Sequence, residues 1–381
     1  TVSSNTCTNM HRAAQDLLNG DYAAGILLFS PQFNGPISIT DNTFTSNDSG
    51  IRSSSYPGGT WTGSGMTIAG NTFASNLYDI VSKYPLSELV LSGSNVLSGK
   101  TLSTQTTNEL YATSDKISDK VDNTAYGLVR TKTANVYVTS SNTVANGIAA
   151  ASAGDTVNVA AGTYDVSTVL TFNKALTLRG ASTGSAGTEA ARASETILVD
   201  ARSADPLNFG FGAAFVIVTP NAVVIDGVTF QGSKILFNGD SGPSVSGPLN
   251  LTISNSRLIL ATIPASGNWN LYLQGNCALT LTNNFFQTTG FNVDNASMLF
   301  WEGTYAGSGA SNIANITGNT FKGISVASPY NSGNGQSLHH LNLGGVQGTV
   351  SNNIFNGSDI GVTLANACGN LTVSSNTFTN M

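Results

Sequence analysis

Five residues in the second half of the chain are candidates for binding or cleaving a polysaccharide. Asp294 and Glu302 carry carboxyl groups of the kind that general acid–base cleavage of a glycosidic bond requires. Trp301 offers an aromatic face for a sugar ring, and the adjacent imidazoles of His339 and His340 can supply polar contacts. On the other hand, a Trp often serves packing alone, and adjacent residues of a strand point to opposite faces. Asp294 and Glu302 are therefore catalytic candidates of an enzymatic alternative, and Trp301, His339 and His340 are binding candidates.

The elements that would position these residues are short strands in repeated coils. The motif apolar-x-apolar-x-x-Asn/Ser-x-apolar recurs at spacings of roughly 23 to 47 residues, as in a solenoid whose coils carry loops of different length. Period-two alternation indicates a strand with one buried face, and an Asn at the following bend tolerates left-handed backbone angles. Identical Asn residues of successive coils can hydrogen-bond in a ladder.

The pattern predicts an all-β protein, a right-handed parallel β-helix. A β-sandwich would instead join equal strands through Asn-Gly hairpin turns, which this chain lacks in convincing positions. The predicted inward residues are Phe44, Phe73, Phe230, Phe286, Phe321, Phe355 and Phe378. The predicted bend residues are Asn42, Asn71, Asn284, Asn319, Asn353 and Asn376.

One outward column of the predicted coils tests the enzymatic alternative. Solenoid enzymes that cleave polysaccharides gather carboxylates with Arg or Lys on one face. The column is small and neutral apart from two charges, and no paired Asp-Asp motif is present. Catalysis is therefore not the main prediction, and a polysaccharide lyase or glycoside hydrolase stays an alternative, as does a carbohydrate-binding module. The column contains Ser3, Thr40, Ala69, Ser92, Arg179, Asp226, Ser254, Thr282, Thr317, Ser351 and Ser374.

A stretch in mid-chain resembles a known family. The sequence Val144-Ala-Asn-Gly-Ile-Ala-Ala-Ala-Ser-Ala-Gly-Asp-Thr-Val-Asn-Val-Ala-Ala-Gly-Thr-Tyr164, followed by Leu176-Thr-Leu-Arg-Gly180, is similar to the opening coil of the pectate-lyase-like β-helix superfamily. The resemblance implies a short capping helix before the first turn. The Asn-x-Phe coils extend the resemblance over nearly the whole chain, and it implies the fold only.

A cap motif preceded by finished coils predicts three regions. We expect residues 1–101 to be terminal coils of a β-helix, residues 102–135 a helical linker, and residues 136–381 a β-helix with an N-terminal cap. The linker has an amphipathic pattern and the densest charge in the chain. Its segment Asp119-Lys-Val-Asp-Asn-Thr-Ala-Tyr-Gly-Leu-Val129 resembles linkers between the repeats of large secreted bacterial surface proteins.

The two ends of the sequence are nearly the same. Thr1-Val-Ser-Ser-Asn-Thr-Cys-Thr-Asn-Met10 and Thr372-Val-Ser-Ser-Asn-Thr-Phe-Thr-Asn-Met381 differ at a single position. Self-similarity is typical of stacked repeats, and a β-helix end presents an unpaired strand edge. We therefore predict a structural or adhesive module that stacks head to tail with copies of itself, or with neighbouring repeats of a surface fibre. The predicted assembly residues are Val2, Asn5, Cys7, Val373, Asn376 and Phe378.

Composition argues against several other classes of function. The net charge is −6 with only 15 basic residues, whereas a nucleic-acid partner requires a basic stripe. Cys7, Cys277 and Cys368 form neither a zinc motif nor a disulfide framework, so no metal and no cofactor are predicted. Calcium is compatible with this fold class, but no motif indicates it. No apolar run of about 18 residues is present, so we predict no membrane insertion. Charged residues make up only 9% of the chain, and Ser, Thr, Asn and Gly are abundant, which favours an extracellular or cell-surface location.

Overall fold

The fold is described in a computed structural model of residues 1–381. The described residues form two compact units. Unit 1 comprises residues 1–151 and 155–160, and unit 2 comprises residues 152–154 and 161–381. The description omits residues 13–22, 30–35, 55–64, 84–87, 202–214, 218–221, 233–234, 239–248, 261–268, 275–276, 289–295, 303–311, 324–337, 366–367 and 381.

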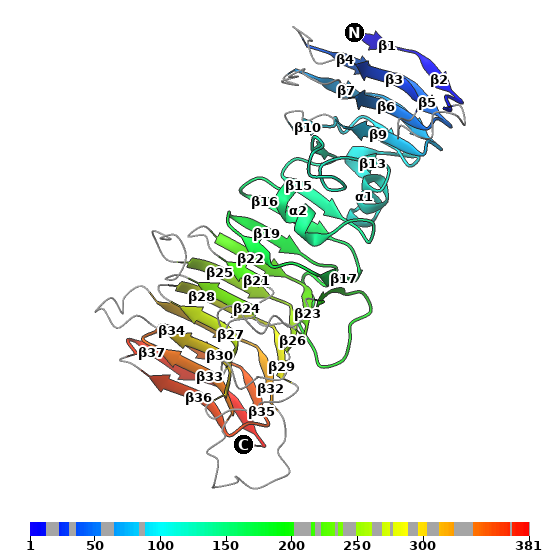
Figure 1. Ribbon diagram of the computed structural model, residues 1–381. Coiled ribbons are helices and arrows are strands. Elements are labelled where there is room, and N and C mark those ends of the chain that lie inside the picture. The colour runs from blue at the N-terminus through cyan, green and yellow to red at the C-terminus, as the bar shows by residue number, and fades with distance from the viewer. Residues whose placement is uncertain are drawn as a thin grey trace. The chain divides into compact units, whose positions relative to one another are not determined.

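Unit 1 is built from coils of three short strands, and each strand pairs in parallel with its equivalent in the next coil (Figure 1). The strands are short because the apolar alternation lasts only a few residues before a bend. The first sheet contains β1 (Val2–Ser3), β4 (Ser38–Thr40) and β7 (Thr67–Ala69). The second contains β2 (Thr6–Thr8), β5 (Thr43–Thr45), β8 (Thr72–Ala74) and β11 (Val96–Leu97). The third contains β3 (Ala24–Phe29), β6 (Ser49–Ser54), β9 (Tyr78–Ser82) and β13 (Ile117–Ser118).

The later part of unit 1 departs from this stacking. Strand β12 (Lys100–Thr101) pairs with β11 in antiparallel orientation. Within the predicted linker, helical structure is limited to the 3-10 helix η2 (Leu102–Thr104) and α1 (Thr107–Ser114). A capping box of Thr106 and Glu109 begins α1. The remaining elements are β10 (Leu89–Val90) with β14 (Val129–Arg130), β15 (Asn135–Val138) with β16 (Asp155–Val159), and α2 (Val144–Ala150), which is the predicted short capping helix.

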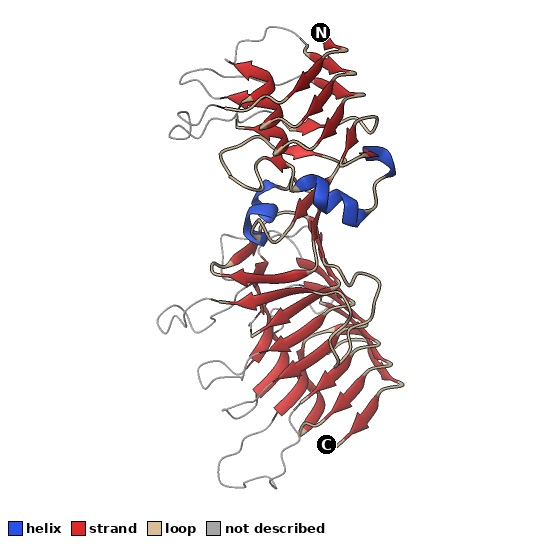
Figure 2. Cartoon of the chain, turned by 90° about the vertical axis from the view of Figure 1, so that its right-hand side faces the viewer, coloured by secondary structure: helices blue, strands red, loops and turns tan. Residues whose placement is uncertain are grey.

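Unit 2 repeats the three-stranded coil, and Figure 2 shows its strands running side by side. Its first sheet contains β19 (Leu176–Arg179), β22 (Ala222–Asp226), β25 (Leu249–Ser254), β28 (Cys277–Thr282), β31 (Ile313–Thr317), β34 (Gln347–Ser351) and β37 (Leu371–Ser374). The second contains β17 (Gly162–Val166), β20 (Thr196–Asp200), β23 (Val228–Gln231), β26 (Arg257–Leu260), β29 (Phe285–Thr288), β32 (Thr320–Lys322), β35 (Ile354–Asn356) and β38 (Thr377–Thr379). The third contains β18 (Leu170–Phe172), β21 (Phe215–Ile217), β24 (Ile235–Asn238), β27 (Trp269–Gln274), β30 (Ala296–Glu302), β33 (Leu338–Gly344) and β36 (Ile360–Ala365). The chain is thus an all-β right-handed parallel β-helix, as predicted.

Columns of identical side chains fill the interior of the coils. The rings of Phe321 and Phe355 stack with their centroids 5.2 Å apart, and Phe286 stacks on Phe321 at 4.7 Å. At the bends, the backbone N–H of Asn319 donates to Oδ1 of Asn353 over 2.9 Å. The predicted inward Phe and bend Asn positions are confirmed, because all of them before the last coil are buried: Phe44, Phe73, Phe230, Phe286, Phe321, Phe355, Asn42, Asn71, Asn284, Asn319 and Asn353.

Residues just before the bend Asn adopt left-handed backbone angles. Ser4, Asp41 and Ser375 have φ values of 59°, 57° and 54°. Only a small or polar residue, or Gly, takes this conformation readily. The bend therefore turns the chain sharply enough for the next strand to begin two residues later, which explains the predicted x-x-Asn-x spacing.

Replacing Phe321 by Ala is expected to lower the free energy of unfolding of unit 2 by about 3 to 5 kcal/mol, because it leaves a cavity between two stacked rings. Urea denaturation followed by circular dichroism measures this loss. Its neighbour Thr320 begins the same strand and is only half-buried, so Thr320→Ala serves as the control and should cost far less. Equal losses in the two variants would contradict the inward register.

Candidate functional site

The sugar-binding candidates do not converge on one surface. Trp301 is fully buried, because it lies in register with Leu273 and Leu343 and points into the core of unit 2. His339 pairs instead with Ser297, four residues earlier in β30, which corresponds to roughly 13 Å along a strand. Asp294 and the side chain of Glu302 lie outside the described residues, although Glu302 is the last residue of β30.

Both predicted histidines are buried, and the ring of each lies beside a hydroxyl group. His339 Nδ1 lies 2.6 Å from Thr363 Oγ1, and His340 Nδ1 lies 3.1 Å from Ser358 Oγ. The His340 ring stacks against Phe355 at a centroid distance of 5.7 Å. Burial lowers the pKa of His340 to about 4 and also lowers the pKa of His339. Burial therefore favours the uncharged form of both rings, and His340 belongs to the packed core.

The described residues hold no candidate metal site. Among them, no cluster of three or more His, Cys, Asp or Glu side chains is arranged to hold a metal ion. Arg179 and Asp226 are register partners on adjacent coils, as the outward column predicted. Asp226 accepts hydrogen bonds from Ser254 and Asn255 within its own surface column. No helix in the described part of the chain is long and apolar enough to cross a membrane.

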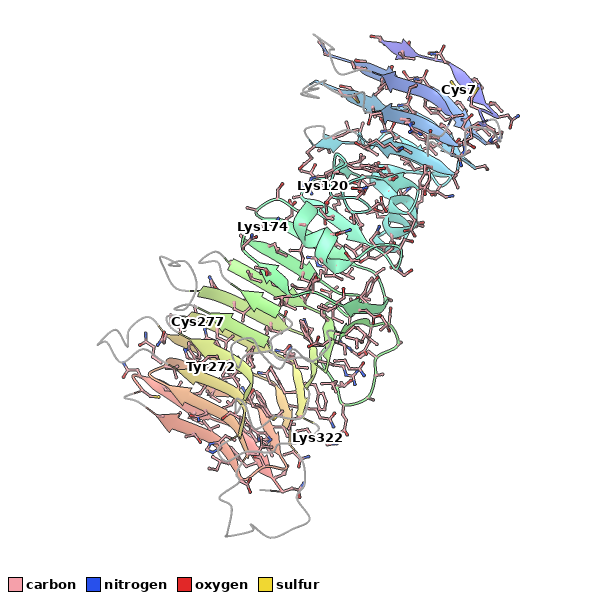
Figure 3. The ribbon with its side chains drawn as sticks, in the orientation of Figure 1. Cys7, Lys120, Lys174, Tyr272, Cys277 and Lys322 are labelled. Atoms are coloured by element: carbon pink, nitrogen blue, oxygen red, sulfur yellow. The ribbon has the colours of Figure 1, made fainter. Side chains whose placement is uncertain are left out.

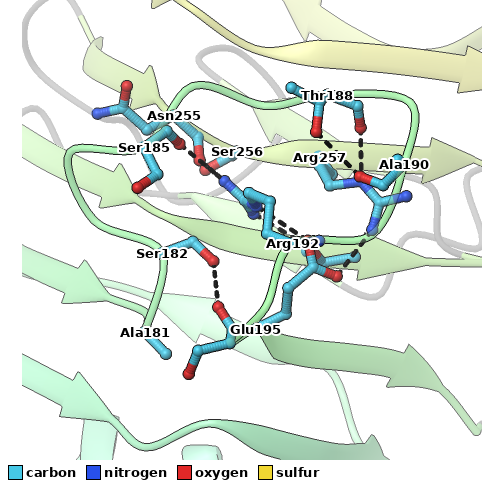
Figure 4. A network of polar contacts seen from close by, with 12 residues as sticks. Ala181, Ser182, Ser185, Thr188, Ala190, Arg192, Glu195, Asn255, Ser256 and Arg257 are labelled. Carbon is cyan, nitrogen blue, oxygen red and sulfur yellow. Dashed lines mark hydrogen bonds and ion pairs between the residues drawn. The ribbon is translucent and has the colours of Figure 1, made fainter.

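A polar network that the sequence did not suggest joins a loop to the second sheet of unit 2. Residues 181–195, here called the strap, lie across β23 and β26 and against the first residue of β29 (Figure 4). The carboxylate of Glu195 accepts hydrogen bonds from Nε of Arg192 over 2.9 Å and from Nη1 of Arg257 over 2.7 Å. Burial raises the pKa of Glu195, but the hydrogen bonds from Arg192 and the charge of Arg257 outweigh it and lower that pKa overall.

The strap is held against the second sheet of unit 2 by hydrogen bonds and close packing. Arg257 also donates to the carbonyl oxygens of Thr188 and Glu189, so its guanidinium holds the strap backbone. Gly187 approaches the sheet so closely that a Cβ would lie 2.2 Å from the carbonyl oxygen of Ser256. The charged groups of the network are directed at contacts within the protein rather than at a ligand. A Gly followed by Arg and Glu in one loop was the only available sequence signal.

The last coil exposes residues whose register partners in the preceding coil are buried. Leu364, Val373 and Phe378 are 51%, 41% and 47% exposed. Their register partners one coil earlier are Leu343, Val350 and Phe355, all with 0% exposure. Phe378 keeps the interior position that was predicted, because its ring stacks on Phe355 at 5.0 Å. Its exposure arises because no described coil covers it.

The first coil of unit 1 also exposes interior positions. Val2 is exposed and pairs with the buried Ile39, and Cys7 is partly exposed and pairs with the buried Phe44. Figure 3 shows Cys7 on this first coil. All three cysteines are free thiols, and burial raises the pKa of Cys277 to about 12. The predicted assembly residues thus lie on or beside the outermost strands β1, β2, β37 and β38.

No protein-family model and no curated protein matches the chain. Among solved structures, one similar chain is a mutant of an alginate lyase of the PL6 family, with 13% sequence identity and a TM-score of 0.32. The similarity covers 90% of this chain and 70% of that chain. The class of this protein, the parallel β-helix, is defined by the three parallel sheets of unit 2.

Proposed function

We propose that the protein is an extracellular structural or adhesive module, whose coils continue end to end with those of a further module. The last coil ends in the strands β37 and β38, and the first coil begins with β1 and β2. These strands carry the repeated decapeptide in the same coil positions. The module is thus one segment of a longer fibre in which sheets of adjoining modules run on without interruption.

A single observation carries this proposal: interior positions are solvent-exposed at both outermost coils. Exposed apolar side chains at an open sheet edge favour addition of another strand. The side chains of Val2, Val373 and Phe378 would become buried in such a junction, at a gain of about 25 cal/mol per Å² of apolar surface. The binding candidates Trp301 and His340 are buried in the core of unit 2 and do not support a sugar-binding surface.

Sedimentation velocity and electron microscopy test the proposal. The wild-type chain is expected to form linear assemblies that lengthen with protein concentration. Phe378→Lys places a charge at the exposed interior position and is expected to abolish them, because the ammonium group would be buried in the junction. Thr377→Lys is the matched control, because Thr377 is exposed on the same strand beside the interior column. A strictly monomeric wild type, or a Phe378→Lys variant that assembles normally, contradicts the proposal.

The enzymatic alternative makes a separate prediction. Glu302→Gln is expected to leave any release of products from alginate, pectin or chitin unchanged, because we expect no cleavage that depends on this carboxyl group. Reducing-end and unsaturated-product assays of the wild type and the variant measure this. A cleavage activity that disappears in Glu302→Gln would replace the structural proposal by a lyase or hydrolase function.

A further inference from the structure

We infer, building on the proposed end-to-end association, that the partner is a second copy of this chain, joined head to tail. The junction forms through the stacked bend asparagines of successive coils, here called the asparagine column. In this junction the backbone N–H and Nδ2 of Asn376 in one copy donate to Oδ1 of Asn5 in the next. Val373 then lies in register with Val2, and Phe378 with Cys7.

The asparagine column has a direction along the solenoid. In each step that the structure describes, the backbone N–H and Nδ2 of one Asn donate to Oδ1 of the Asn in the following coil. Asn5 donates to Asn42 over 2.9 Å from both groups. Asn353 donates to Asn376 over 3.0 Å from both groups. Donors therefore face the C-terminal end of each of these coils and acceptors face the N-terminal end.

The two ends of the column are complementary. Oδ1 of Asn376 already accepts from Asn353, and its Nδ2 donates to the carbonyl oxygen of Val350 over 2.9 Å. Its backbone N–H and second Nδ2 hydrogen have no partner among the described residues. Asn5 uses its N–H and Nδ2 toward Asn42 and Ser3, and no described residue donates to its Oδ1. One end thus lacks an acceptor and the other lacks a donor.

Main-chain hydrogen bonds between neighbouring coils run in both directions and fix the register of the junction. Within the molecule, the N–H of Ser4 donates to the carbonyl oxygen of Thr40, and the N–H of Thr43 donates to that of Asn5. The equivalent bonds across the junction run from Ser375 to Ser3 and from Thr6 to Asn376. Two C-terminal ends brought together would oppose donors to donors at Asn376. Tail-to-tail pairing therefore leaves these donors unsatisfied, at a cost that head-to-tail pairing avoids.

The interior column also fits a second copy. Phe378 would stack above the position of Cys7, which is occupied by Phe44 in the next coil. The smaller Cys side chain leaves room for the Phe378 ring to settle toward Phe44 without displacing the strands. Because the coil accepts Cys at this position in β2, it should also accept Cys in β38.

An engineered disulfide tests the register. In a Cys368→Ser background, Phe378→Cys places a thiol in register with Cys7 of the next copy, and register partners on neighbouring parallel strands lie within disulfide range. Mild oxidation is expected to give a ladder of covalent dimers, trimers and higher multimers on a non-reducing gel. The ladder should disappear when Cys7→Ser is added. Thr377→Cys in the same background is the positional control and should give far less cross-linking.

The outcomes separate this inference from the proposed function. Covalent dimers that persist with Cys7→Ser would show tail-to-tail pairing through the thiols introduced at position 378 of two copies, and would overturn the head-to-tail register. Linear assemblies in sedimentation without a Cys7-dependent disulfide would also overturn it, while leaving end-to-end association intact. A wild-type chain that stays monomeric at all concentrations would overturn both. Circular dichroism of each variant shows that it is folded.

Discussion

Replacing Glu195 by Ala is expected to destabilise unit 2 by about 3 to 5 kcal/mol, because it leaves two buried guanidinium groups without their carboxylate. The side chains of Arg192 and Arg257 are each 10% exposed, and Glu195 is 4% exposed. Their charges are therefore poorly compensated by water once the pair is broken. The strap should also loosen, because Glu195 joins the arginine of the loop to the arginine of β26.

Urea denaturation and limited trypsin digestion measure the two effects. The strap should become sensitive to cleavage after Arg192, which the wild type protects through hydrogen bonds to Ser185 and Asn255. Lys322→Ala is the control, because it removes an exposed ion pair with Glu189 and should cost less than about 1 kcal/mol. A Glu195→Ala variant as stable and as protease-resistant as Lys322→Ala would show that the network contributes nothing to stability.

Acidification from pH 7.5 to pH 5 is expected to stabilise unit 1 and to destabilise unit 2, each by on the order of 2 kcal/mol. In unit 1, burial raises the pKa of Asp79 to about 6 and that of Asp119 to about 7. A raised acid pKa adds stability at low pH, which is lost as the pH rises through the folded value. In unit 2, the pKa of His340 is lowered to about 4, so its contribution is lost as the pH falls below about 6.5.

Hydrogen exchange with mass spectrometry resolves the two units, provided that rates are corrected for intrinsic exchange at each pH. Peptides from the second and third sheets of unit 1 should gain protection at pH 5, whereas peptides that cover β33 and β35 should lose it. His340→Gln is expected to flatten the response of unit 2, and Asp119→Asn that of unit 1. Groups with lowered acid pKa values, such as Glu109, act only below about pH 5. A change in protection of the same sign in both units would contradict the assignment of the pH response to Asp79, Asp119 and His340.

The coil interior was predictable because every coil repeats the same short pattern. An inward Phe such as Phe321 follows its Asn by two residues in many coils, so a misread coil is corrected by its neighbours. The linker lacks that redundancy. Its amphipathic pattern predicted a longer helix, yet α1 ends at Ser114. Further along, Asp119 accepts the backbone N–H groups of Val121 and Val129 and stabilises a turn instead.

The candidate sites also differ in how well the sequence could predict them. The assembly residues were found because two decapeptides match, which is a property of the sequence alone. Trp301 was placed in a sugar-binding groove, but the alternation of Leu299 and Trp301 follows that of Leu271 and Leu273 and marks it as inward. The strap was missed because Arg257 meets Glu195 across 62 residues, and a loop without periodicity gives no indication of which strand it will contact.

Because of the asparagine column, the length of the solenoid can change only by complete coils. Neighbouring bend residues are separated by 24, 35 and 23 positions at Asn71, Asn284 and Asn353, and the hydrogen bonds between them are nevertheless the same. Loop length is therefore free, whereas the strand and bend are not. Removal of a complete coil, from one bend Asn to the next, rejoins all three sheets and the ladder. Removal of part of a coil turns buried faces toward water. Natural variation in length should accordingly occur by the gain or loss of whole coils.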